Sequence, residues 1–100
     1  VVYREAIVDD RPVGEAQLHI NDQAWLWAFE IYPDYRRKGY AKDFMGLLMQ
    51  EVSDLGFGEL HLWCHSDNHA GIGLYTGLGF EVVEQIYRGV HMCKKISINE

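Results

Sequence analysis

Apolar and polar residues alternate along the first part of the chain, a pattern typical of β-strands. Residues 1–8 and 13–20 have apolar side chains at about every second position, and short segments rich in Asp, Asn and Pro follow each of them. Residues 24–32 are apolar at almost every position, as expected for a central strand that is covered on both faces. These three segments predict an antiparallel meander.

The third predicted strand carries one charged residue. Strict alternation would place Trp25, Trp27, Phe29 and Ile31 on one face of this strand. Glu30 lies near its carboxyl end, and carboxylates are seldom placed in such strands without a partner or a chemical task. Two interpretations of Glu30 are open: the strand has reached solvent at this point, or the carboxylate is a general base.

The rest of the chain alternates between helical and strand patterns. Residues 41–55 have apolar side chains at helical spacing and predict an amphipathic helix. Residues 58–65 predict a strand, so this strand–helix–strand order implies a right-handed parallel crossover. A short helix at 69–77 and an antiparallel pair of strands at 81–87 and 90–98 complete the prediction. The expected fold class is α/β, in the α+β sense of a mixed sheet with helices.

A short basic segment, residues 36–41, joins the third strand to the long helix. It reads Arg-Arg-Lys-Gly-Tyr-Ala. The first N–H groups of a helix have no partner within the helix, and the helix dipole adds positive charge there. A glycine before such a helix lets an anion approach the backbone closely. The segment therefore predicts a phosphate site, with a solvated basic surface as the alternative.

Composition excludes several other classes of function. The 100 residues allow one domain, 1–100, and the net charge of −6 argues against nucleic acid as the main partner. No segment is apolar enough to cross a membrane, and no signal peptide is visible. Cys64 and Cys93 are expected to be buried free thiols in a reducing compartment, which favours a cytoplasmic protein. His61 and His65 share a strand face but are well separated, and we expect no metal site.

Two motifs resemble those of one enzyme superfamily. Residues 36–41 resemble the R/Q-x-x-G-x-G/A loop of the GNAT superfamily of N-acetyltransferases. Residues 68–80 resemble the N-x-x-A-x-x-L-Y-x-x-x-G-F segment of the same superfamily, with glycine at 71, 73 and 77 in place of the usual helix formers. The resemblance covers residues 24–96 and implies a GNAT-like acyl-CoA N-acyltransferase fold.

The resemblance also implies a function, an acetyl-CoA-dependent N-acetyltransferase, and roles for particular residues. Acetyl-CoA would be the cosubstrate, and a primary amine of a small molecule or a protein would attack it directly, without a covalent enzyme intermediate. The first motif would hold the coenzyme A pyrophosphate, and the end of the third strand would pair with the pantetheine arm. The implied cofactor-binding residues are Phe29, Ile31, Arg36, Arg37, Lys38, Gly39, Tyr40, Ala41, Lys42 and Asn68.

Acetyl transfer from a thioester to an amine needs an acid and a base. The resemblance makes Tyr75 the acid that protonates the leaving thiolate, which a phenol of pKa about 10 can do in direct contact. The alternative is that the Tyr75 ring is only a wall of the thioester pocket. Glu30 is the first candidate for the base, acting directly or through water, and His65, Tyr32 and bulk water are its rivals.

The chain departs from the superfamily pattern at its beginning. The superfamily has a strand and two helices before the position that matches Val1, and they build much of the acceptor pocket. Three explanations are open: the sequence is a piece of a longer protein, a partner such as a second copy in a homodimer supplies the wall, or the site is unusually open. The second functional hypothesis is a non-catalytic acetyl-CoA-binding module that regulates a partner protein.

Overall fold

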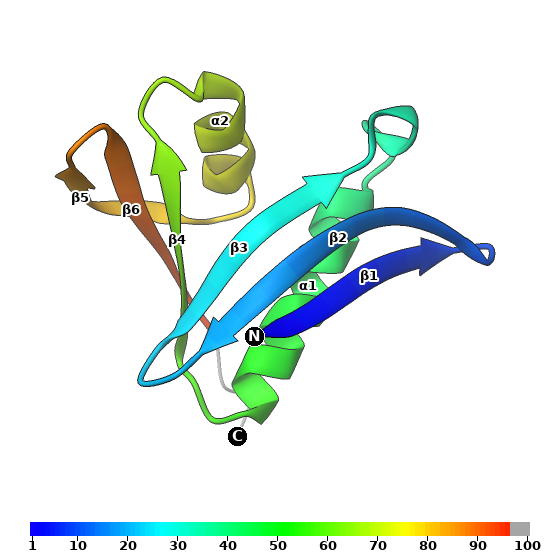
Figure 1. Ribbon diagram of the computed structural model, residues 1–100, viewed down its shortest axis with the longest axis horizontal. Helices are drawn as coiled ribbons and strands as arrows, with labels where there is room; N and C mark the ends of the chain where they lie inside the picture. The colour runs from blue at the N-terminus through cyan, green and yellow to red at the C-terminus, as the bar shows by residue number, and fades with distance from the viewer. Residues whose placement is uncertain (97–100) are drawn as a thin grey trace.

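The central feature of the fold is a six-stranded mixed sheet in the order β1-β2-β3-β4-β6-β5 (Figure 1). The computed structural model describes residues 1–96. Only β3 and β4 pair in parallel; the other neighbours are antiparallel. The elements are β1 (Val2–Val8), β2 (Arg11–Ile20), β3 (Ala24–Ile31), the 3₁₀-helix η1 (Pro33–Tyr35), α1 (Tyr40–Asp54), β4 (Glu59–His65), α2 (His69–Gly77), β5 (Glu81–Ile86) and β6 (Gly89–Lys95).

This arrangement confirms the predicted meander, the parallel crossover and the final antiparallel pair. The mixed α+β sheet is the expected fold class. The strand predicted to end at residue 98 ends at Lys95, and the last two residues of that prediction lie outside the described residues. The 3₁₀-helix η1 was not predicted, because a single Pro-led turn has too short a pattern to detect.

Helix α1 packs one face against the sheet, as its sequence pattern predicts. Phe44, Met45, Leu48 and Val52 are all buried. The helix begins one residue before the predicted start, at Tyr40, because Gly39 adopts the left-handed conformation (φ 83°) and acts as its N-cap. The apolar stripe and the preceding glycine together fix where the helix starts and which face it buries.

A β-bulge in β3 overturns the predicted alternation of that strand. Glu15 pairs with Glu30 and Gln17 pairs with Trp27, so the residue between the two positions of β2 faces two residues of β3. Ala28 lies in this bulge with a φ of 51°. The expectation that Phe29 and Ile31 share a face with Trp25 and Trp27 is therefore wrong. Phe29 stacks on Phe44 of α1, whereas Trp27 is 50% exposed.

The expectation that β3 is covered on both faces is also wrong within the described residues. Ala24, Leu26 and Ile31 lie in the core beneath α1. On the other face, Trp27 is exposed and Trp25 is half-buried against histidine rings. Apolar composition alone cannot tell a covered face from an exposed aromatic one.

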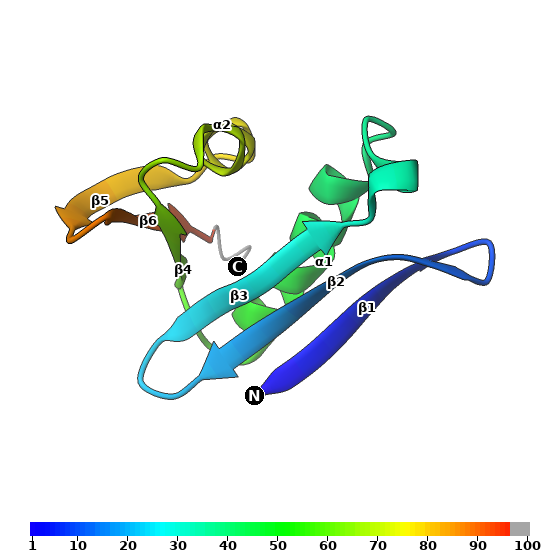
Figure 2. The ribbon, with the colours of Figure 1, turned by 45° about the horizontal axis from the view of Figure 1, so that its top comes forward.

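Strands β3 and β4 separate soon after they begin. They pair only where Ala24–Leu26 of β3 run beside Leu60–Leu62 of β4, and beyond this point the two strands diverge (Figure 2). The backbone of β3 from Trp27 to Ile31 therefore has no ladder to β4. Neither helix among the described residues is long and apolar enough to cross a membrane.

Candidate active site

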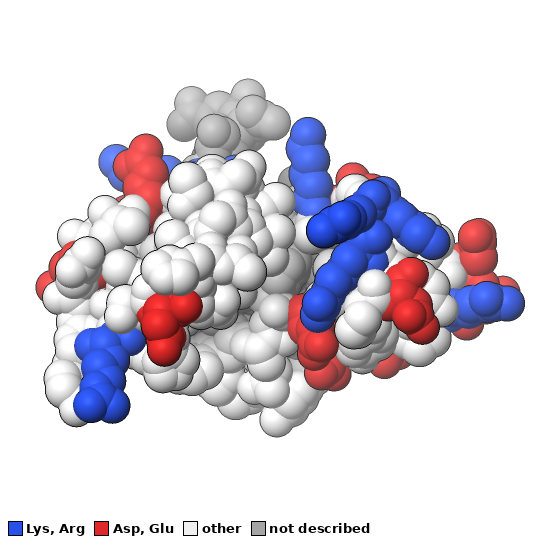
Figure 3. Space-filling view, turned by 90° about the horizontal axis from the view of Figure 1, so that it is seen from above, with Lys and Arg blue, Asp and Glu red and all other residues white. Residues whose placement is uncertain are grey.

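A cleft of about 770 Å³ opens where β3 and β4 diverge. Three parts of the chain line it: the end of β3, the loop and first turn of α1, and helix α2. Lys and Arg side chains gather beside the hollow in the surface seen from above (Figure 3). Its lining residues are Phe29, Glu30, Ile31, Tyr35, Arg36, Arg37, Gly39, Tyr40, Ala41, Lys42, Asn68, Ala70, Gly71, Gly73, Leu74, Tyr75, Gly77 and Leu78.

One end of the cleft is the N-terminus of α1. The loop before it contains two left-handed residues, Arg37 (φ 64°) and Gly39 (φ 83°), which turn the chain tightly into the helix. The N–H groups of the first helical residues, Tyr40 to Lys42, cannot be satisfied within the helix. A Cβ added to Gly39 would meet no atom within 4 Å, so the space above this backbone is open. The geometry is that of an anion site.

Arg36 is tied to the end of β3. Its Nε donates a hydrogen bond of 2.8 Å to the Ile31 carbonyl, and its Nη2 lies 3.8 Å from Glu30 Oε1. These contacts hold the basic loop against the strand. Lys38 lies outside the lining of the cleft, and its Nζ is 5.9 Å from the centre of the Tyr35 ring, a cation–π contact. Arg37 and Lys42 therefore supply the cationic side chains that line the helix start, together with Arg36.

Asn68 begins the opposite wall of the cleft as the N-cap of α2. Its Oδ1 accepts a hydrogen bond of 2.9 Å from the Gly71 backbone N–H. A Cβ on Gly71 would lie 2.5 Å from Asn68 Nδ2, so only glycine leaves room for this side chain. The glycine that departs from the superfamily pattern thus has a local role: it lets the cap fold back over the first turn of α2.

Tyr75 lines the cleft with its ring in an aromatic cluster. The ring centre is 6.3 Å from that of Phe29 and 5.9 Å from that of Phe80. Burial, with a smaller contribution from nearby Cys64, raises the pKa of the Tyr75 hydroxyl above its ordinary value. The hydroxyl therefore keeps its proton at neutral pH and can act as a proton donor but not as a base.

The candidate bases occupy different environments. Glu30 lines the cleft, and its side chain is 46% exposed, which agrees with the interpretation that β3 has reached solvent there. Burial and the nearby Glu15 raise the pKa of Tyr32, so this hydroxyl is a poor base at neutral pH. His65 packs edge-on against Trp63 and is not among the lining residues. Among residues 1–96, Glu30 is thus the one carboxylate in the lining of the cleft.

The cleft brings together Tyr75, Glu30 and all the implied cofactor-binding residues except Lys38, whereas the rival bases Tyr32 and His65 do not line it. The lining residues that sequence reasoning missed are Tyr35 of η1 and the face of α2 formed by Ala70, Leu74 and Leu78 with its glycines. The weak helical pattern of 69–77 did not show which of its faces would be turned to the cleft. Only the packing of α2 beside the open end of β3 decides this.

Comparisons with known proteins agree with this geometry. The sequence profile of the acetyltransferase (GNAT) family matches residues 1–80. The uncharacterized N-acetyltransferase YycN of Bacillus subtilis is 31% identical over 68 residues, which are 68% of this chain and 44% of that protein. The [ribosomal protein bS18]-alanine N-acetyltransferase of Escherichia coli K12 is 36% identical over 59 residues, 59% of this chain and 40% of the enzyme. The chain thus spans less than half the length of these relatives.

A solved structure gives the same result for the fold. The PaiA N-acetyltransferase of Thermoplasma acidophilum, in complex with coenzyme A, superposes with a TM-score of 0.85 at 25% identity. The match covers 94% of this chain and 60% of that one. With the sequence match over residues 1–80 and the shared fold, the chain belongs to the acetyltransferase (GNAT) family.

Proposed function

We propose that this chain carries the coenzyme A site and the catalytic tyrosine of an acetyl-CoA-dependent N-acetyltransferase. One observation carries the proposal: a single cleft is lined by the first turn of α1, by the end of β3 that has no ladder to β4, and by Tyr75. These three features suit the pyrophosphate, the amide-bearing arm and the thioester of the coenzyme.

The helix start suits the pyrophosphate. The N–H groups of Tyr40, Ala41 and Lys42 can donate to phosphate oxygens, and the helix dipole adds positive potential there. Arg37 and Lys42 add full charges beside them. Arg36 has a positioning role, because its guanidinium is committed to Ile31 and Glu30.

The splayed segment of β3 suits the amides of the pantetheine arm. An extended chain that enters the gap can hydrogen-bond to the backbone of Phe29 and to the Ile31 N–H as an added strand would, because the Glu30 backbone faces β2. The Ile31 carbonyl is already bonded to Arg36, so Phe29 supplies the free carbonyl on this side. The acetyl group would then lie near Tyr75, and a β3 N–H can donate to its carbonyl oxygen as negative charge develops.

Proton transfers follow from the environments of the side chains. The acceptor amine loses a proton to Glu30 or to a water that Glu30 orients, and its nitrogen attacks the thioester carbon. As the carbon–sulfur bond breaks, the Tyr75 hydroxyl donates its proton to the leaving thiolate. Burial raises the pKa of Cys64, the thiol near this site, so it is a poor nucleophile at neutral pH. This favours direct attack over an acyl-enzyme.

The acceptor in this proposal is a primary amine. The Escherichia coli relative is named for acetylating an alanine of ribosomal protein bS18, so peptides with a free N-terminal alanine are the first acceptors to test. Small amines and lysine-containing peptides with blocked N-termini form the comparison set. A homodimer, or a preceding segment of the protein, would complete the acceptor wall.

Calorimetric titration with acetyl-CoA tests the coenzyme site. Gly39→Glu should weaken binding by more than about tenfold, or about 1.4 kcal/mol, because it places a carboxylate over the helix start. Gly46→Glu makes the same change at an exposed position further along α1 where a Cβ meets no atom within 4 Å, and it should bind like the parent. Equal affinity in all three proteins would overturn the proposed site.

Turnover measured by mass spectrometry of the acceptors tests the chemistry. Tyr75→Phe keeps the ring packing and should lower kcat by about 100-fold or more, with little change in affinity for acetyl-CoA. A kcat equal to that of the parent would exclude the acid role. Glu30→Gln should lower kcat with little change in the affinity for acetyl-CoA, because the amide cannot accept the proton of the amine. Tight binding of acetyl-CoA with no acetylated acceptor would instead favour the non-catalytic regulatory module.

A further inference from the structure

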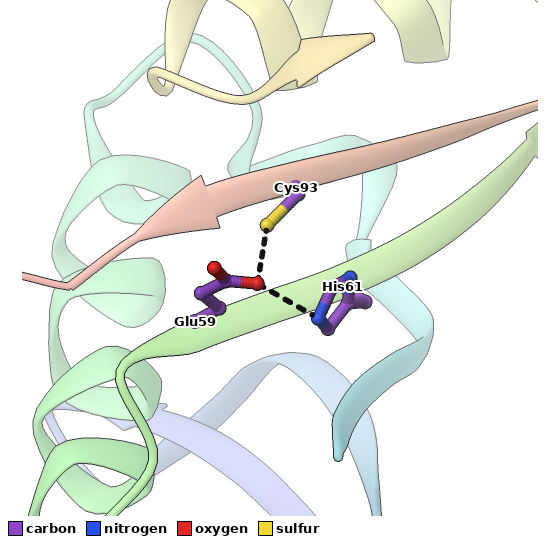
Figure 4. Close-up of side chains that lie close together, drawn as sticks. All are labelled: Glu59, His61 and Cys93. Atoms are coloured by element: carbon purple, nitrogen blue, oxygen red, sulfur yellow. Dashed lines mark hydrogen bonds and ion pairs between the residues drawn. The ribbon is translucent and has the colours of Figure 1, made fainter. Parts of the chain in front are cut away.

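A second cluster of chemically active side chains lies on the sheet, outside the cleft. Glu59 and His61 of β4 meet Cys93 of β6 (Figure 4). His61 Nε2 is 3.2 Å from Glu59 Oε2, and Cys93 Sγ is 3.4 Å from the same oxygen. The three ligand-type atoms all lie within 4.8 Å of one another. None of these residues lines the coenzyme cleft, so the proposed function gives the cluster no task.

Strand register explains why the three residues meet. His61 and Cys93 are direct partners in the antiparallel pair of β4 and β6, and Glu59 is two residues before His61 on the same face. On the next strand, Glu81 of β5 is the direct partner of Cys93. One row across β4, β6 and β5 therefore holds the His61 imidazole, the Cys93 thiol and the Glu81 carboxylate. The Glu59 carboxylate lies next to this row on β4.

The spacing matches that of metal ligands. In a tetrahedral zinc site with bonds of about 2.0 Å to nitrogen and oxygen and about 2.3 Å to sulfur, neighbouring N and O ligands are about 3.3 Å apart and O and S ligands about 3.5 Å apart. The observed separations are 3.2 Å and 3.4 Å. His61 Nε2 and Cys93 Sγ lie within 4.8 Å of each other, so an ion can occupy the position between the three atoms after side-chain adjustment.

His61 is held in the orientation that a ligand needs. Its side chain is 8% exposed, and its ring stacks on Trp25 with centres 5.1 Å apart. Its Nδ1 lies 2.8 Å from His91 Nε2, and His91 Nδ1 lies 3.8 Å from Glu84 Oε1. In the tautomer that carries its proton on Nδ1, this N–H donates to His91 and the Nε2 lone pair faces the cluster. Outer partners of this kind orient histidine ligands in metal sites.

The electrostatics of the cluster favour a cation. The Glu59 carboxylate lies beside both the Cys93 thiol and the His61 ring and gives the cluster a negative charge. Lys95 and Glu81 are the other charged groups near the thiol, and their charges are of opposite sign. The complex of a divalent ion with one thiolate, one carboxylate and a neutral imidazole has no net charge.

The cluster has room for a further ligand. A cavity of about 510 Å³ adjoins it, lined by Glu59, His61, Glu81 and Cys93 among others. A water or the Glu81 carboxylate can therefore complete a fourth position. Imidazole, thiolate and carboxylate together select Zn²⁺ among the common divalent ions, and Co²⁺ is its spectroscopic substitute.

We propose that Glu59, His61 and Cys93 form a zinc-binding site that joins β4 to β6, with water or Glu81 as the fourth ligand. Binding replaces the sulfur–hydrogen bond of Cys93 by a sulfur–metal bond and releases one proton to solvent. No electron transfer takes place. The site is independent of the coenzyme cleft, so it holds whether or not the protein is an acetyltransferase.

Titration of the reduced, metal-free protein with Co²⁺ under anaerobic conditions tests the proposal. The expected result is one bound ion per chain, a thiolate-to-cobalt charge-transfer band, visible bands of the strength of tetrahedral cobalt, and displacement by Zn²⁺. Proton release on binding, measured in weakly buffered solution, should be close to one per ion. An octahedral cobalt spectrum without a charge-transfer band would overturn the proposal.

Matched variants locate the site. Cys93→Ser should abolish the charge-transfer band, whereas Cys64→Ser, which removes the other thiol, should keep it. Glu59→Gln changes a partly exposed side chain, and it should lower the affinity by about tenfold or more with the fold intact by circular dichroism. The control His65→Gln on the same strand should bind like the parent. Unchanged cobalt affinity in Glu59→Gln, or loss of the charge-transfer band in Cys64→Ser, would contradict the assignment.

Discussion

The two glycines at 71 and 73 allow a quantitative test of how α2 is built. Both lie within the helix, where glycine costs about 1 kcal/mol relative to alanine by propensity alone. A Cβ on Gly73 would meet no atom within 4 Å, whereas one on Gly71 would lie 2.5 Å from Asn68 Nδ2. The same substitution should therefore have different effects at the two positions.

The expected magnitudes follow from these contacts. Gly73→Ala should raise the free energy of unfolding by up to about 1 kcal/mol, which corresponds to a rise in Tm of about 4–8 °C for a domain of this size. Gly71→Ala gains similar propensity but displaces Asn68 from its 2.9 Å bond to the Gly71 N–H. Loss of an N-cap costs about 1 kcal/mol, so its net effect should be near zero or destabilising.

Urea denaturation followed by circular dichroism gives the comparison. We expect Gly73→Ala to be more stable than Gly71→Ala by about 1 kcal/mol or more. A double-mutant cycle isolates the cap: Asn68→Ala should cost about 1 kcal/mol in the parent and in Gly73→Ala, but much less in Gly71→Ala. If Asn68→Ala costs the same in all three backgrounds, the argument that Gly71 makes room for the cap is wrong.

Three further predictions test the core, the approach of β2 to β3, and the buried phenol. Leu48→Ala, at a side chain 2% exposed, should lower the free energy of unfolding by about 2–5 kcal/mol, whereas Leu47→Ala, at a side chain 72% exposed, should change it by less than about 0.5 kcal/mol. Gly14→Ala should cost about 1–3 kcal/mol and Gly58→Ala much less, because a Cβ on Gly14 collides with backbone of β3 while one on Gly58 meets no atom within 4 Å; equal Tm values would contradict this. The raised pKa of Tyr75 means that the unfolded chain loses this proton first as pH rises. Stability should therefore be complete below about pH 10 and fall above it, and the fall should be smaller in Tyr75→Phe; identical profiles would refute the shift.

Much of the coenzyme cleft follows from local sequence. The N-terminus of α1 is specified by neighbouring residues: a glycine that can adopt φ 83°, a basic loop, and an apolar stripe that starts directly afterwards. Asn68 is a residue type that favours the N-cap position, and its Oδ1 makes the capping bond. These features depend on interactions between residues close in sequence, which is why pattern and motif predict them.

The bulge in β3 lies beyond such reasoning. Nothing in the sequence around Ala28 predicts its φ of 51°, and the regular alternation of Trp25, Trp27 and Phe29 favours a strand without a bulge. The bulge arises from pairing with β2, and it turns Phe29 toward α1. The contact of Arg36 also could not be predicted from local sequence. The basic motif predicts that Arg36 binds phosphate, whereas its hydrogen bond to the Ile31 carbonyl depends on how the loop folds back against β3.

The sequence by itself determined the strand and helix order, the basic, glycine-led start of α1, the position of Tyr75 in a recognised motif, and the family. Each of these depends on residue type and short-range spacing. Only the tertiary structure decided where β3 and β4 separate to open the cleft, and that Glu59 and His61 meet Cys93. Alternation along β4 predicts the face of His61, but its neighbour on that face is set by strand order and register, which arise from packing of the whole sheet.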